Sequence, residues 1–191
     1  MSAARPDKPP DEASLHEAAL SYLARYAATQ AMLRRVLDRR VDRWARAQGQ
    51  EVDATEVADA RRLVGTVVAE LTAAGAVDDA AFATARARSL ARAGRSQRAV
   101  ISYLAAKGVA GDTARAALPI EDDAELAAAL ALAARRRIGP FRRPDAVPDE
   151  TQRRRELGVL ARAGFAQSVA ARTLVMEREE AEELLHRLRR G

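Results

Sequence analysis

Three stretches of the 191-residue chain resemble one another, and this internal repeat constrains the fold more than any other feature. The stretches read QAMLRRVLDRRV from Gln30, QRAVISYLAAKGV from Gln97, and RRELGVLARAGF from Arg154, the last aligned with one gap. In this alignment Leu37 matches Leu104, and Gly108 matches Gly164. Such a repeat is typical of small helical units that cannot bury their own apolar faces and gain stability by stacking on neighbours.

The central copy carries the start and stop signals of a helical unit. Asp78 or Asp79 is placed to cap a first helix, and Gly94 is the expected left-handed residue at its end. Ser96 can cap a second helix, which Gly108 would end. The acidic start DDAAFA recurs later in the chain as DDAELA, so helix starts repeat as well as helix ends.

Similar signals mark the helices before this copy. Ser14 and Glu17 have the spacing of a capping box at the start of a first helix. A second amphipathic helix is expected to run to about Gln48. Asp53 is expected to cap a third helix that ends at Gly75, which completes one unit of three helices.

The same signals continue toward the C-terminus. Asp112 is expected to cap a short helix that Pro119 stops. Asp122 or Asp123 is expected to begin a helix that reaches Arg137. Further apolar stripes predict two more helices and then a final, acidic one.

No segment alternates with period two, so we predict an all-α fold of three tandem three-helix repeats that form an elongated, curved body. Residues 1–13 are polar and contain prolines, and we expect a disordered lead-in there. The repeats are expected at residues 14–75, 76–119 and 120–191. The Pro/Arg-rich stretch at 139–150 is interpreted as an ordinary solvent loop, with a mobile basic loop that reaches a partner as the alternative.

The absence of cysteine excludes a disulfide scaffold, a thiolate metal site and a cysteine nucleophile, and it fits a reducing cytosol. No apolar run approaches the roughly 20 residues needed to span a bilayer. The polar start of the chain has no signal-peptide core. We therefore expect a cytoplasmic protein that has no membrane partner.

The side chains typical of an enzyme are not arranged in any recognisable constellation. His16 and His186 are the only histidines, and neither has a second ligand at metal-binding spacing. The paired aspartates are better explained as helix caps than as catalytic carboxylates. No Walker-type phosphate loop is present. We predict no catalytic residue, no metal and no cofactor, and we expect Trp44 and the tyrosines to pack in the core rather than stack on bases.

Arginine dominates the charge of the chain. Residues 81–117 include seven cationic side chains and one anionic side chain, Asp112. The resulting net charge of +6 exceeds the +5 of the whole chain. Guanidinium groups bind phosphates and carboxylates bidentately, so these positions are candidates for contact with DNA or with an acidic protein surface. Ordinary solvated helix faces are the alternative. The candidate contact residues are Arg34, Arg35, Arg39, Arg40, Arg43, Arg86, Arg88, Arg92, Arg95, Arg98, Lys107, Arg135, Arg136, Arg142, Arg143, Arg153 and Arg154.

The combined order of these weak motifs resembles the bacterial RecX regulatory proteins. The resemblance runs from about Leu15 to the C-terminus and rests on ALSYLARYAATQAMLRRVLDRRV, GAVDDAAFA, LAAKGV and LARAGF. It implies a cytoplasmic, non-enzymatic modulator that binds along the groove of the RecA filament on single-stranded DNA. It further implies inhibition of recombinase and co-protease activity by limiting filament growth or stability.

The first repeat departs from the family pattern at its helix end. It has Arg39, Arg40 and Val41 where the other repeats have Lys-Gly-Val or Ala-Gly-Phe, so its second helix should continue to Trp44 and beyond. Ala28 and Thr29 replace the more usual serine-containing start of that helix.

Two other functions also fit the residues. A general nucleic-acid-binding helical protein would use the basic stripes without any specificity for RecA. A passive helical adaptor would bind neither RecA nor DNA. In every case we expect a monomer.

Overall fold

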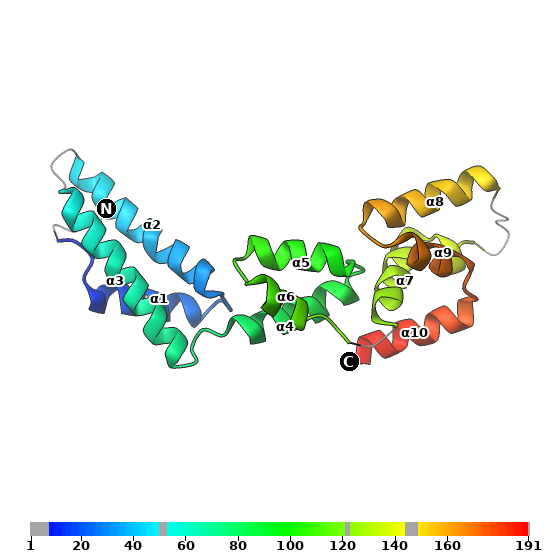
Figure 1. The fold of residues 1–191 in the computed structure, drawn as a ribbon, viewed down its shortest axis with the longest axis horizontal. Coiled ribbons are helices and arrows are strands. Elements are labelled where there is room, and N and C mark those ends of the chain that lie inside the picture. Colours follow the sequence, from blue (N-terminus) through cyan, green and yellow to red (C-terminus); the bar gives the residue numbers. More distant parts are fainter. Residues whose placement is uncertain (1–7, 50–52, 121–122, 144–148, 191) are drawn as a thin grey trace. The chain divides into compact units, whose positions relative to one another are not determined.

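The computed structural model describes residues 8–49, 53–120, 123–143 and 149–190. These residues form ten α-helices and one short 3₁₀ helix, and they include no β-strand (Figure 1). The prediction of an all-α fold is therefore confirmed. Within the described ranges, no helix combines the length and the apolar composition needed to cross a membrane.

The chain divides into two compact units. Unit 1 comprises Met1–Phe82 together with Lys107–Val109, and unit 2 comprises Ala83–Ala106 together with Ala110–Gly191. The division falls inside the fourth helix and again around the turn that follows the fifth helix.

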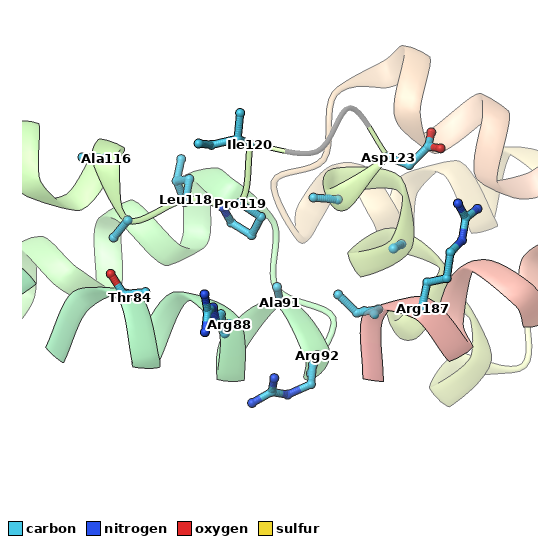
Figure 2. A pocket seen from close by; sticks show the side chains of 14 residues that line it. Thr84, Arg88, Ala91, Arg92, Ala116, Leu118, Pro119, Ile120, Asp123 and Arg187 are labelled. Carbon is cyan, nitrogen blue, oxygen red and sulfur yellow. The ribbon is translucent and has the colours of Figure 1, made fainter. Parts of the chain in front are cut away.

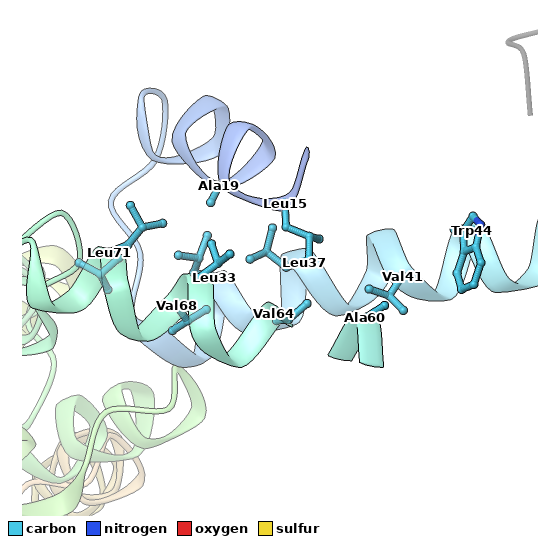
Figure 3. Packing of buried hydrophobic residues seen from close by; sticks show 12 residues of the cluster. Leu15, Ala19, Leu33, Leu37, Val41, Trp44, Ala60, Val64, Val68 and Leu71 are labelled. Carbon is cyan, nitrogen blue, oxygen red and sulfur yellow. The ribbon is translucent and has the colours of Figure 1, made fainter. Parts of the chain in front are cut away.

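Unit 1 is built on three helices, α1 (Glu12–Leu23), α2 (Gln30–Gln48) and α3 (Ala54–Ala73). The long helix α2 continues past Trp44, as its sequence predicts, and it ends at Gly49, where φ is +74°. Figure 3 shows Leu33 and Leu37 of α2 facing Val64 and Val68 of α3, with the side chains of α1 covering them.

The core of unit 1 is made almost entirely of aliphatic side chains. Burial of each leucine or valine contributes about 1.5 to 3 kcal/mol relative to exposure, which makes this cluster the main source of stability in the unit. Trp44 is 3% exposed, so the prediction that it packs in the core is confirmed. The cluster comprises Leu15, Ala19, Leu33, Leu37, Val41, Trp44, Ala60, Val64, Val67, Val68, Leu71 and Val77.

The first helix begins three residues earlier than the capping box at Ser14 predicts. Its N-cap is Asp11, whose carboxylate accepts a hydrogen bond of 2.9 Å from the backbone N–H of Ser14. That hydrogen bond lowers the pKa of Asp11. Ser14 therefore lies inside the first turn, and the capping box predicted from it is wrong. The predicted lead-in at 1–13 overlaps the helix at its last two residues, and residues 1–7 lie outside the described part of the chain.

Seven further α-helices follow. The 3₁₀ helix η2 lies between α7 and α8, and α10 adds a fourth α-helix to the third predicted repeat. Their bounds are α4 (Asp79–Arg92), α5 (Gln97–Ala106), α6 (Gly111–Ala116), α7 (Ala124–Arg136), η2 (Gly139–Phe141), α8 (Glu150–Arg162), α9 (Gln167–Val175) and α10 (Arg178–Arg190).

Helix α7 is the central element of unit 2. It packs against α8, α9 and α10, and every residue from Leu126 to Ala133 is buried. Five of these eight residues are alanine, whose small side chain allows neighbouring helices to approach on all sides. Further apolar residues pack on opposite sides of α7, including Leu160 and Phe165 in one cluster and Met176 and Leu184 in another.

Two predicted caps in this part of the chain are wrong. Helix α6 begins after Ala110, and Asp112 lies in its first turn, where it pairs with Arg115 instead of capping. Asp123 precedes α7 but makes no capping hydrogen bond, and its carboxylate lies 3.5 Å from the guanidinium of Arg172. Asp122 lies outside the described residues.

The stretch predicted as a loop at 139–150 has structure at both ends. Residues 139–141 form η2, with Gly139 buried, and Glu150 is the first residue of α8, capped by Asp149. Residues 144–148 lie outside the described part of the chain. The interpretation as an ordinary solvent loop is therefore wrong for residues 139–141.

Candidate functional site

The same pair of hydrogen bonds occurs once in each unit. In unit 1 the hydroxyl of Thr29, the N-cap of α2, donates to the carbonyl oxygen of Lys107 at 2.6 Å. In unit 2 the hydroxyl of Ser96, before α5, donates to the carbonyl oxygen of Ala163 at 2.8 Å. Both hydroxyls also accept a hydrogen bond from the first turn of their own helix. Thr29 therefore has the same role in unit 1 as Ser96 has in unit 2.

The second hydrogen bond of each pair joins a carboxylate to the backbone N–H of the residue that follows the hydroxyl residue. Asp79 accepts from the backbone N–H of Gln30, and Glu125 accepts from the backbone N–H of Gln97, both at 2.9 Å. Burial raises the pKa of Glu125, and the hydrogen bond from Gln97 only partly offsets this rise. Asp78 is left as the cap of its own helix.

In both arrangements, glycine is required in the turn that lies against the start of the bonded helix. Gly108 has φ +87°, and a Cβ on it would lie 2.2 Å from the Cβ of Ala31. Gly164 has φ +92°, and a Cβ on it would lie 2.7 Å from the Oγ of Ser96. We call these arrangements joint 1 (Thr29, Gln30, Asp79, Lys107 and Gly108) and joint 2 (Ser96, Gln97, Glu125, Ala163 and Gly164). The aligned glycines of the repeat thus have a structural role.

The predicted basic residues are almost all on the surface. Lys107 and Arg142 are partly buried, and the other candidates are exposed. Carboxylate partners within the described ranges are recorded for Arg142 and Arg154. The exposed candidates of unit 1 lie on α2, and those of unit 2 are distributed over several helices and the segments between them.

On α2 the cations form a row. Arg35, Arg39 and Arg43 are spaced four residues apart, which places them along one face of the helix. The guanidinium of Arg43 donates back to the carbonyl oxygen of Arg39 at 3.3 Å, so the side chain follows the helix surface. Arg34 lies apart from this α2 row, against Gly65 of α3.

Arg40 and Arg43 line two hollows on unit 1, of about 420 and 430 Å³. The larger hollow also has Arg25, Tyr22 and Tyr26 on its walls. The two tyrosine rings lie 5.2 Å apart between centroids, and Tyr26 is 57% exposed. An exposed aromatic ring beside three arginines can stack on a base while the arginines contact phosphates.

The five arginines between residues 86 and 98 have different surroundings. Arg88 and Arg92, one turn apart on α4, line a cavity of about 560 Å³ in unit 2 together with Arg187 of α10 (Figure 2). Arg95 lines a smaller hollow beside Glu125. Arg86 and Arg98 are exposed and line neither space.

Arg142 is a structural residue, which corrects its assignment to an exposed basic face. Its guanidinium is held by Glu156, with an Nε to Oε1 distance of 2.8 Å, and the two side chains are 15% and 5% exposed. Glu156 also accepts from the backbone N–H of Gly139 at 3.3 Å and from Gln152 at 3.2 Å. Burial raises the pKa of Glu156, but these hydrogen bonds outweigh it and hold the pKa below its usual value.

Other candidates in unit 2 have different surroundings. Arg135 donates to the carbonyl oxygen of Ala93 after α4, and Arg154 pairs with Glu150 at 3.1 Å one turn earlier. Within the described ranges, no group of three or more histidine, aspartate or glutamate side chains is arranged to hold a metal ion. The two histidines lie in different units.

Two residues that line the hollows and the cavity, Arg25 and Arg187, were not predicted. A third, Tyr26, was expected to pack in the core, and its exposed fraction of 57% shows that this prediction is wrong for it. Arg25 and Tyr26 follow α1, and Arg187 lies in the last turns of α10, a helix whose glutamates are all in its first half. Arg187 immediately precedes Leu188 on the apolar stripe of α10, and this position was the available signal that its side chain lies close to the core of unit 2.

Comparison with known proteins gives one family. A family model described as the second three-helix domain of RecX matches residues 78–118. The regulatory protein RecX of Myxococcus xanthus is 39% identical over 162 residues, which cover 84% of this chain and 83% of that protein. The regulatory protein RecX of Agrobacterium fabrum is 42% identical over 110 residues, 58% of each chain.

A solved structure shares the fold. The crystal structure of RecX from Lactobacillus salivarius is 14% identical to this chain, with a TM-score of 0.60. The superposition covers 90% of this chain and 97% of that one.

Proposed function

The chain belongs to the RecX family of regulatory proteins, and on that premise we propose that it is a non-enzymatic regulator of the RecA filament on single-stranded DNA. It limits the growth or the stability of the filament and so inhibits recombinase and co-protease activity. The family membership, over more than four-fifths of the chain, is the observation that carries this proposal.

The surface chemistry supports a polyanionic partner of this kind. The α2 row presents three guanidinium groups at one-turn intervals, and such groups bind phosphate or carboxylate oxygens in a fixed, bidentate geometry. A nucleoprotein filament offers both kinds of oxygen. We therefore assign the α2 row, together with Arg86 of α4 and Arg153 of α8, to filament contact.

The test is the ATPase activity of RecA from the same organism on single-stranded DNA, titrated with the protein at fixed salt. Inhibition well below one molecule per RecA protomer is expected, because a molecule that caps or locks a filament acts on many protomers. Inhibition that begins only when the protein is in excess over DNA would overturn the proposal.

A pair of variants separates specific contact from total charge. Arg39→Ser with Arg43→Ser removes two cations from the α2 row, whereas Arg62→Ser with Arg154→Ser removes two surface cations that already pair with Asp59 and Glu150. Inhibition should weaken at least about tenfold in the first variant and little in the second, a difference of about 1.4 kcal/mol in binding.

The second candidate function is general nucleic-acid binding without RecA specificity. The hollow that combines Tyr26 with Arg25, Arg40 and Arg43 favours it. It predicts tight binding to bare single-stranded DNA, with an affinity that falls steeply with salt. Unchanged RecA activity at protein concentrations that saturate DNA would favour this candidate over the filament regulator.

A further inference from the structure

The cavity in unit 2 has a long apolar wall. Its lining includes Ala91 of α4 and Leu118, Pro119 and Ile120, which follow α6, and Figure 2 shows Ile120 across the cavity from Arg88 and Arg92. Ile120 is 93% exposed, an unusual position for a large aliphatic side chain in a cavity wall. The wall therefore offers apolar area that no described part of the chain covers.

Cations surround this wall. Arg88 and Arg92 lie on α4 and Arg187 on α10, and none of the three has a carboxylate partner among the described residues. Among the described residues of the lining, Asp123 is the one acidic residue, and it is 3.5 Å from Arg172, which is outside the lining. The described lining thus has an excess of positive charge beside an apolar surface.

We propose that this cavity binds an acidic peptide segment of a partner protein, with carboxylates on the three arginines and an aliphatic side chain against Ile120 and Leu118. Arginines one turn apart on a helix present their guanidinium groups to neighbouring carboxylates of one extended segment. Burial of an aliphatic side chain supplies the apolar part of the affinity. A volume of about 560 Å³ accommodates a few side chains.

The composition of the lining favours a peptide over single-stranded nucleic acid. Sites for single strands combine a basic groove with aromatic rings on which the bases stack, and the described residues that line this cavity include no aromatic side chain. In unit 1, by contrast, a hollow contains two tyrosines beside its arginines. The inference does not rest on RecA as the partner, because it concerns the chemistry of the cavity itself.

The test measures fluorescence anisotropy of labelled probes with the full chain. The first probe is an extended peptide of about 12 residues that contains Asp, Glu and Ser with a central Leu. The second replaces the central Leu by Ser, and the third replaces every acid by Asn or Gln. An oligothymidylate of the same length is the nucleic-acid probe.

The first probe should bind, the second several-fold more weakly, and the third at least tenfold more weakly. Arg88→Ser with Arg92→Ser should weaken the first probe at least tenfold, and Ile120→Ser should weaken it several-fold. The matched control, Arg86→Ser with Arg153→Ser, removes two exposed cations outside the cavity and should leave the affinity unchanged. All these side chains are exposed, so the helical circular dichroism of every variant should match the parent.

Three results would overturn the inference. One is a first probe that does not saturate below about 1 mM. The second is equal loss of peptide binding in the cavity variant and in the control variant, which would indicate a charge effect only. The third is oligothymidylate binding that depends on Arg88 and Arg92 while peptide binding does not, which would assign the cavity to nucleic acid. None of these results changes the RecA ATPase titration, so the two proposals fail separately.

Discussion

The hydroxyl of Ser96 donates to the carbonyl oxygen of Ala163 at 2.8 Å, and this bond ties the start of α5 to the turn after α8. The two residues are 67 positions apart in the chain. The same hydroxyl caps α5 by accepting from the backbone N–H of Ala99 at 3.2 Å. One buried side chain thus holds both the helix start and joint 2.

Removal of this hydroxyl should destabilise unit 2. Ser96→Ala loses an N-cap, which costs about 1 kcal/mol, and leaves the carbonyl of Ala163 without its partner, which costs about 1 to 2 kcal/mol more. The measurement is the free energy of unfolding in urea. Ser102→Ala, at an exposed position of the same helix, is the control and should change stability by less than about 0.5 kcal/mol. Equal effects of the two substitutions would show that the hydroxyl of Ser96 does not hold the joint.

Gly108→Ala should be more destabilising than Gly75→Ala. Both glycines have positive φ, +87° and +72°, so either alanine carries about 1 to 2 kcal/mol of backbone strain. Only the Gly108 substitution places a Cβ against Ala31, whereas nothing lies within 4 Å of a Cβ at Gly75. The clash should add about 1 to 3 kcal/mol, measured by denaturant unfolding. Equal losses of unfolding free energy in the two variants would mean that α2 does not lie close to the turn at Gly108.

Glu156→Gln should destabilise unit 2 at neutral pH by about 3 kcal/mol, because it leaves the guanidinium of Arg142 without its charge partner in a largely buried site. Glu150→Gln is the matched control, since its partner Arg154 is well exposed, and it should change stability by less than about 1 kcal/mol.

The effect of Glu156 should depend on pH in a defined direction. Its pKa is lower in the folded protein than its usual value of 4.5, so the carboxylate stabilises the fold fully above that value. This contribution is lost as the pH falls through the lower, folded pKa. The stability difference between the parent and Glu156→Gln should therefore shrink below about pH 4. A difference that stays constant down to pH 2 would contradict the ion pair.

Leu104→Ala should cost about 2 to 5 kcal/mol, because the side chain is fully buried. Val175→Ala, in the same unit and 79% exposed, should cost less than about 0.5 kcal/mol. Thermal unfolding followed by circular dichroism measures both. A small effect at Leu104 would place it outside the core.

Local signals in the sequence were enough to predict most helix ends. Gly49, Gly75, Gly94, Gly108 and Gly164 all have positive φ, and each follows a helix as expected. A left-handed residue after a helix depends on the local backbone, and glycine is the residue that adopts that conformation at least cost. The continuation of α2 beyond Trp44 was predicted for the same reason, because no glycine occurs before Gly49.

Residue roles that depend on distant partners were not predictable. Asp79 was a candidate cap for its own helix, yet it binds the N–H of Gln30, 49 positions away. Arg142 was a candidate surface cation, but it binds Glu156, which also accepts from the backbone N–H of Gly139. Charge and spacing specify what a side chain can bind, whereas tertiary packing decides which partner it reaches.

The two joints also bear on how such a chain can change over evolutionary time. Each consists of a hydroxyl, a carboxylate, two backbone groups and a glycine, and joint 1 uses Thr and Asp where joint 2 uses Ser and Glu. The ends of successive repeats are therefore chemically interchangeable. Duplication or loss of a whole repeat in the gene would leave matching ends on either side, and a longer or shorter protein of the same kind could arise in one step.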